Sequence, residues 1–134
     1  MENCIFCKIA KHEIPAYIVY EDKDFIAFLD IAPLTEGHVL VIPKQHYRWV
    51  WDMPNIDKYY KVAGKVANAL RKALNTEQVL SYVIGEEVPH AHIWLIPKKE
   101  GDSLSELMDI SKRKKKDYTP EMFKEIAEKI RKYL

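Results

Sequence analysis

Two histidines separated by a single residue, His90 and His92, are the residues of this sequence best suited to chemistry. They lie in a short apolar segment that predicts a strand over residues 91–96, stopped by Pro97. Because successive side chains of a strand point to opposite faces, His90, His92 and Trp94 are expected on one face. Two imidazoles on the same face indicate a functional site rather than simple core packing.

The imidazole pair fits two kinds of site, and the residues leave both open. In the first, one zinc ion binds both His90 and His92 and keeps an open position for water. In the second, His90 completes a closed zinc site with Cys4, Cys7 and His46, and His92 stays free of metal as a nucleophile. The Cys4-x-x-Cys7 spacing favours zinc over redox chemistry, because thioredoxin-like motifs are typical of a helix start within a βαβ unit.

Length and composition predict one domain over residues 1–134, with a substantial buried core. The formal net charge of +1 gives no broad positive field, so no nucleic-acid partner is expected. No apolar run approaches the roughly 20 residues that cross a bilayer. Residues 1–4 also lack the basic start of a signal peptide. We therefore expect a cytoplasmic protein without a membrane partner.

An antiparallel sheet is expected to position the histidines. Segments rich in aromatic and β-branched residues predict about five strands, at residues 17–20, 25–29, 38–42, 79–84 and 91–96. Between the third and fourth strands, apolar residues recur every three or four positions over residues 54–74. This period predicts one long helix packed on the sheet.

The C-terminal third carries helix signals and a basic run. Ser103 and Glu106 have the spacing of a capping box, which opens a short helix. Thr119 and Pro120 are typical of the start of a last helix. The run of lysines and arginine over residues 112–116 is interpreted as a solvated loop. The predicted fold class is α+β.

Several short motifs occur in an order and spacing that resemble the histidine triad (HIT) family over nearly the whole chain. They are Cys4-Ile-Phe-Cys7-Lys-Ile, Glu13-Ile-Pro15, Phe28-Leu-Asp30-Ile-x-Pro33, Gly37-His38-Val-Leu-Val-Ile-Pro43-Lys-x-His46 and His90-x-His92. The resemblance implies a HIT-like fold and a homodimer. It also implies a nucleotide hydrolase or nucleotidyl transferase that works through a covalent nucleotidyl-histidine.

The resemblance assigns roles to particular residues. His92 attacks the α-phosphorus of a purine nucleoside phosphoramidate, an adenylylated compound or a dinucleoside polyphosphate, and Asp30 accepts hydrogen bonds from the ribose. The nucleotide slot beside Asp30 is lined by Phe6, Ile9, Phe28, Ile31, Leu40 and Trp94. A structural zinc is held by Cys4, Cys7, His46 and His90. His38 either supports the site from behind or packs in the core.

Two features depart from the family pattern. The third triad position, normally histidine, is Trp94, whose indole cannot give up a proton to a leaving group. The loop over residues 85–89 is short, lacks the family's phosphate-binding Asn and Ser, and carries Glu86 and Glu87. An alternative hypothesis is therefore a nucleotide-binding module with weak or no turnover.

Overall fold

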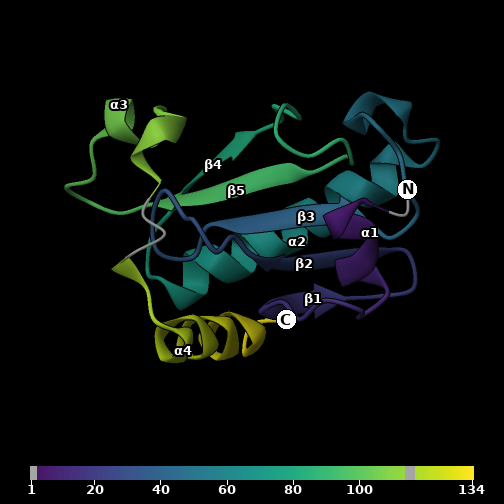
Figure 1. Cartoon of the computed structure of the whole chain (residues 1–134). Helices are drawn as coiled ribbons and strands as arrows, with labels where there is room; N and C mark the ends of the chain where they lie inside the picture. Colours follow the sequence, from purple (N-terminus) through teal and green to yellow (C-terminus); the bar gives the residue numbers. More distant parts are fainter. Residues whose placement is uncertain (1–2, 114–116) are drawn as a thin grey trace.

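The structure is a computed structural model that describes residues 3–113 and 117–134, and its centre is a five-stranded antiparallel sheet (Figure 1). The strands are β1 (Ile18–Glu21), β2 (Phe25–Leu29), β3 (Val39–Pro43), β4 (Gln78–Tyr82) and β5 (Ile93–Lys98). Their spatial order is β1-β2-β3-β5-β4, and each neighbouring pair is antiparallel. The predicted α+β class and sheet are confirmed.

Helices cover both faces of the sheet (Figure 1). The helices are α1 (Ile5–Ala10), α2 (Ile56–Ala73), α3 (Leu104–Leu107) and α4 (Pro120–Arg131), with short 3₁₀ turns at Val50–Asp52 and Ile110–Lys112. Alternate residues of β2 divide between the faces. Phe25 and Ala27 pack into the core under α2 and α4, whereas Ile26 and Phe28 pack under α1. Because both faces are covered, β2, β3 and most of β5 are buried.

The segment that carries the two histidines differs from its prediction. Strand β5 begins at Ile93, so His90 and His92 precede it instead of lying within it. The N–H of Ala91 donates to the carbonyl of Tyr47 at 2.7 Å, which ties this segment to the loop after β3 rather than to a neighbouring strand. Pro97 lies inside β5, beyond the stretch that pairs with β3. It therefore needs no hydrogen bond to β3 there.

The chain ends also combine confirmed and missed features. Thr119 accepts the N–H of Met122 at 3.2 Å and begins α4 as predicted, and Ser103 accepts the N–H of Glu106 at 3.4 Å at the start of α3. Helix α1 was not predicted. Its N-cap is Cys4, whose sulfur accepts the N–H of Cys7. Among the described residues, no helix is both long and apolar enough to span a bilayer.

Candidate functional site

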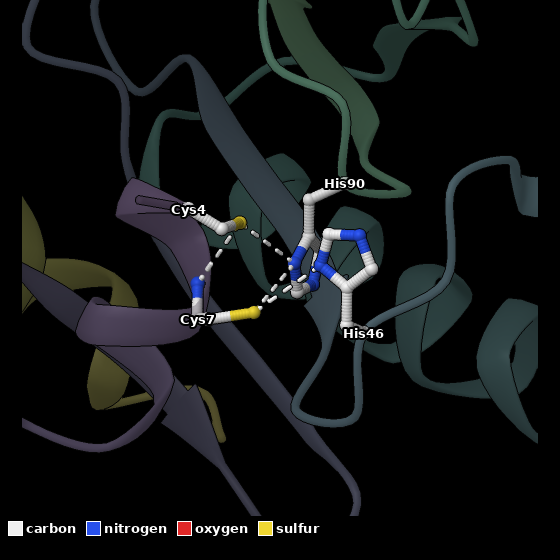
Figure 2. Close-up of side chains that lie close together, drawn as sticks. All are labelled: Cys4, Cys7, His46 and His90. Carbon is white, nitrogen blue, oxygen red and sulfur yellow. Dashed lines mark hydrogen bonds between the residues drawn. The ribbon is translucent and has the colours of Figure 1, made fainter. Parts of the chain in front are cut away.

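Four residues from three separate segments form a compact Cys₂His₂ cluster (Figure 2). Their ligand atoms all lie within 4.8 Å of one another; the residues are Cys4, Cys7, His46 and His90. The Nδ1 atom of His90 lies 3.3 Å from the sulfur of Cys4 and 3.4 Å from that of Cys7. The sulfur of Cys7 lies 3.2 Å from Nδ1 of His46. These residues can hold a metal ion.

The hydrogen bond and the neutral ring of His90 suit a divalent cation, whereas the Cys7 thiol must lose its proton to bind one. The Nε2–H of His90 donates to the carbonyl of Pro43 at 2.8 Å, so Nδ1 keeps its lone pair toward the sulfurs. Burial lowers the pKa of His90 to about 4, which keeps its imidazole neutral. Burial and the neighbouring Cys4 raise the pKa of the Cys7 thiol to about 11. A bound cation favours the thiolate, and two sulfurs with two imidazoles match tetrahedral zinc ligation.

His92 has the opposite arrangement of its ring nitrogens. Its Nδ1–H donates to the carbonyl of His90 at 2.7 Å, so the lone pair is on Nε2. The residue is 4% exposed, and the ring of Phe6 stands edge-on to it at 5.2 Å between centroids. Burial lowers the pKa of His92 below 6.5, so its imidazole is neutral at neutral pH. Because its Nδ1 is committed to a carbonyl and His92 is outside the four-residue cluster, a single metal bound by both histidines does not fit.

A cavity of about 230 Å³ lies beside His92. Every residue that the family resemblance places at the nucleotide lines it: Phe6, Ile9, Phe28, Asp30, Ile31, Leu40, His92 and Trp94. The lining also includes residues to which the sequence assigned no role at the nucleotide, namely Ile5, Ile14, Pro15, Ala16, Tyr17, Leu29, Glu87, Val88 and Arg113. The walls are mainly apolar, with Asp30 and His92 among the few polar groups, which is typical of a small-molecule site.

Asp30 is 5% exposed and is held from several sides. Its Oδ1 accepts the N–H of Ala32 at 2.8 Å, and Nη2 of Arg113 lies 2.8 and 2.9 Å from its two oxygens. Nε2 of His38 lies 3.7 Å from Oδ2. Because Nδ1 of His38 accepts the N–H of Leu34 at 3.1 Å, its proton is on Nε2 and faces the carboxylate. His38 is thus both buried and adjacent to the site.

Arg113 corrects one prediction, since this residue of the basic run is not part of a solvated loop. Its Nη1 contacts both oxygens of Glu87 at 3.0 and 2.7 Å, its Nε donates to the carbonyl of Ala32 at 2.7 Å, and its guanidinium lies 5.4 Å from the ring centroid of Trp94. The charge of Glu87 is therefore paired. In a basic run no local pattern distinguishes the one arginine that folds inward. Residues 114–116 of the run lie outside the described residues.

Comparisons with known proteins agree with this geometry. The HIT domain matches residues 11–101, and the chain therefore belongs to the HIT family. It is 45% identical to the adenosine 5′-monophosphoramidase HNT1 of Saccharomyces cerevisiae over 75% of this chain and 65% of that protein. It is 35% identical to the adenylylsulfatase HINT3 of Arabidopsis thaliana over 76% of this chain and 55% of that protein.

A solved structure extends the similarity to nearly the full length. The zinc-bound histidine triad family protein from Mycobacterium smegmatis superposes with a TM-score of 0.82 and 29% identity. The match covers 98% of this chain and 93% of that protein. Both chains therefore share the same fold.

Proposed function

We propose that the protein is a nucleotide hydrolase or nucleotidyl transferase in which His92 attacks the α-phosphorus of a purine nucleotide. The observation that carries this proposal is the hydrogen bond from Nδ1–H of His92 to the carbonyl of His90, which leaves Nε2 as the nucleophilic nitrogen. Burial supports the same role because it lowers the pKa of His92 and keeps the ring neutral. The relatives named for phosphoramidase and adenylylsulfatase activity belong to this reaction class.

The reaction divides into two displacements at phosphorus. Nε2 of His92 forms a bond to the α-phosphorus while the bond to the leaving group breaks, and water then displaces the nucleotide from His92. The hydrogen bond from Nδ1–H to the carbonyl of His90 holds the ring in one tautomer and stabilises the positive charge that develops on it. The proposed substrates are purine nucleoside phosphoramidates, adenylylated compounds and dinucleoside polyphosphates.

The cavity supplies the proposed nucleoside contacts. Aromatic and aliphatic side chains such as Phe6, Phe28 and Leu40 offer flat apolar surfaces for a purine ring. Asp30 stands in the same cavity, and a carboxylate accepts hydrogen bonds from the ribose hydroxyls. Arg113 and Ala32 orient that carboxylate.

We infer that the Cys₂His₂ cluster holds a structural zinc. Two thiolates and two imidazoles fill a tetrahedral shell and leave no open position for water. The ion would tie the N-terminus of α1 to the segment that carries His92, and so hold the nucleophile against Phe6. A homodimer, which the family resemblance implies, stays a prediction that sedimentation equilibrium tests.

The direct test of the proposal is to trap the nucleotidylated enzyme. Adenosine 5′-phosphoramidate is added to the zinc-loaded protein, the reaction is quenched, and the intact mass is measured. We expect a mass increase of one adenylyl group that maps to His92, and a loss of at least about 10³-fold in kcat/KM for His92→Ala. The control is His12→Ala, because the side chain of His12 is 54% exposed and outside the site. Equal activity of His92→Ala and the wild type would exclude the proposal.

A nucleotide-binding module without turnover is the second candidate, and Trp94 favours it. The residue lines the cavity at the position where the family carries a third histidine. If Trp94→His raises turnover more than about 10-fold while the Kd for AMP stays constant, the missing proton donor limits the reaction. The binding-module function then gains support.

A further inference from the structure

A second cavity of about 410 Å³ adjoins the one that contains His92. Its lining includes Arg48 and His46, and it shares Ile5, Glu87 and Val88 with the nucleoside cavity. The two spaces therefore lie on either side of the same short loop. If the nucleoside part of a substrate occupies the first cavity, the second cavity is the nearest space for the leaving group bonded to the α-phosphorus.

Arg48 is the unusual group in this second cavity. Its Nη1 is buried, and within residues 3–113 and 117–134 it has no hydrogen-bond partner. An unpaired buried guanidinium nitrogen carries a cost in free energy, so it calls for an explanation such as a bound anion. The guanidinium is also preorganised, since its Cζ stacks 3.6 Å from the ring centroid of Trp49.

The loop before the histidines is built to pack against this stack. Gly85 has φ +76°, and a Cβ at this position would lie 3.0 Å from Cζ3 of Trp49 and 3.7 Å from Nη1 of Arg48. A side chain at Gly85 would therefore be strained and would press on the stack. Glu87, the carboxylate that lines both cavities, is paired with Arg113. No ion pair of Arg48 occurs among the described residues, so its positive charge is left for an external group.

Given the proposed function, we propose that Arg48 forms a leaving-group subsite for an oxyanion. The substrates that it favours are mixed anhydrides of a nucleotide with a strong acid, such as a nucleotidyl sulfate, over phosphoramidates. A planar guanidinium matches two oxygens of sulfate, phosphate or carboxylate, whereas it has no acceptor for an amine.

The need for a proton on the leaving group also favours nucleotidyl sulfates over phosphoramidates. As Nε2 of His92 bonds to phosphorus, the P–O bond to sulfate breaks and its electron pair stays on the sulfate oxygen. Sulfate is the anion of a strong acid and needs no proton. The nitrogen of a phosphoramidate must take up a proton to leave, and the indole of Trp94 has none to give. Arg48 stabilises the negative charge of the sulfate that leaves a nucleotidyl sulfate.

The experiment compares two substrates in the zinc-loaded protein, adenosine 5′-phosphosulfate and adenosine 5′-phosphoramidate. We expect the wild type to favour the phosphosulfate, and Arg48→Gln to lower the ratio of the two kcat/KM values by about 10- to 100-fold, as loss of a charge-assisted hydrogen bond predicts. Arg48→Lys keeps the positive charge but loses the pair of parallel N–H donors, so it should give an intermediate ratio of the two kcat/KM values. The matched control is Arg71→Gln, an exposed arginine of α2 that contacts Asn68 at 3.2 Å.

Binding of the product anion provides a readout that does not depend on turnover of the variants. In the presence of saturating AMP, inorganic sulfate should bind the wild type, and its Kd, measured by calorimetry, should rise about 10-fold in Arg48→Gln. An unchanged substrate ratio together with unchanged sulfate affinity would overturn the subsite while His92 trapping still supported the proposed function. If neither substrate is hydrolysed and no nucleotidyl-His92 forms, both proposals fail.

Discussion

His90 and His92 are separated by one residue, yet the structure prepares them for different chemistry. Each imidazole is buried and donates one N–H to a backbone carbonyl. His90 donates from Nε2 to Pro43, and His92 donates from Nδ1 to His90. The remaining nitrogen of His90, Nδ1, faces two sulfurs. The remaining nitrogen of His92, Nε2, carries the lone pair of a candidate nucleophile. The carbonyl that accepts the hydrogen bond therefore decides which nitrogen of each ring stays free.

The surroundings of the two rings differ as well. The Cys₂His₂ cluster joins α1, the loop after β3 and the segment before β5, so its loss is expected to affect folding. The cavity carries the ion-pair network of Asp30, Arg113 and Glu87, so changes there are expected to affect ligand binding and local charge. Substitutions can separate these two kinds of effect.

The largest expected effect is disruption of the Cys₂His₂ cluster. Cys7→Ser should abolish zinc binding and lower the free energy of unfolding by about 3 kcal/mol or more, because metal binding is coupled to folding. The melting temperature should fall by roughly 10 °C. Zinc content by elemental analysis and calorimetry measure both. His92→Ala is the matched comparison and should keep one zinc per chain. A Cys7→Ser protein that binds zinc and melts normally would remove the difference between the two regions.

A somewhat smaller effect is expected from the buried histidine behind the cavity. Burial lowers the pKa of His38 to about 4, whereas an unfolded chain takes up this proton near pH 6.5. The unfolded state thus binds more protons between these values, and stability falls by about 3 kcal/mol as the pH drops from 6.5 to 4. His38→Asn keeps an acceptor for the N–H of Leu34 and does not titrate. Urea unfolding across this pH range should show a pH slope reduced by one proton; an unaltered slope contradicts the assignment.

The smallest effect concerns Arg113, which lines the cavity. Arg113→Ala removes charge-assisted hydrogen bonds from the buried Asp30, which should cost about 2 kcal/mol of stability. It should also raise the pKa of His38, because the charge of Arg113 lowers it. Lys112→Ala, in the same run but exposed, is the control. NMR titration and denaturant unfolding measure the two quantities. If both variants behave alike, the run is a solvated loop after all.

The regular elements were predictable because each one carries its own local signal. The aromatic and β-branched residues of β2 predicted its bounds, Phe25–Leu29, and the helical period over residues 54–74 predicted α2 at Ile56–Ala73. Helix α1 was missed because six residues are too short for a clear period and its cap is a cysteine sulfur. The start of β5 was predicted two residues too early, because the backbone hydrogen bond from the N–H of Ala91 to the carbonyl of Tyr47 replaces strand pairing there.

The amino-acid sequence by itself determined the fold class and the residue types that can ligate a metal or attack phosphorus, because these follow from periodicity and from motifs in a fixed order. The tertiary structure alone decided which nitrogen of each histidine is free, and that Arg113 reaches Asp30 from 83 positions away. It also decided that Nη1 of Arg48 is buried without a partner among the described residues. These properties depend on distances between segments far apart in the chain, for which no local pattern exists.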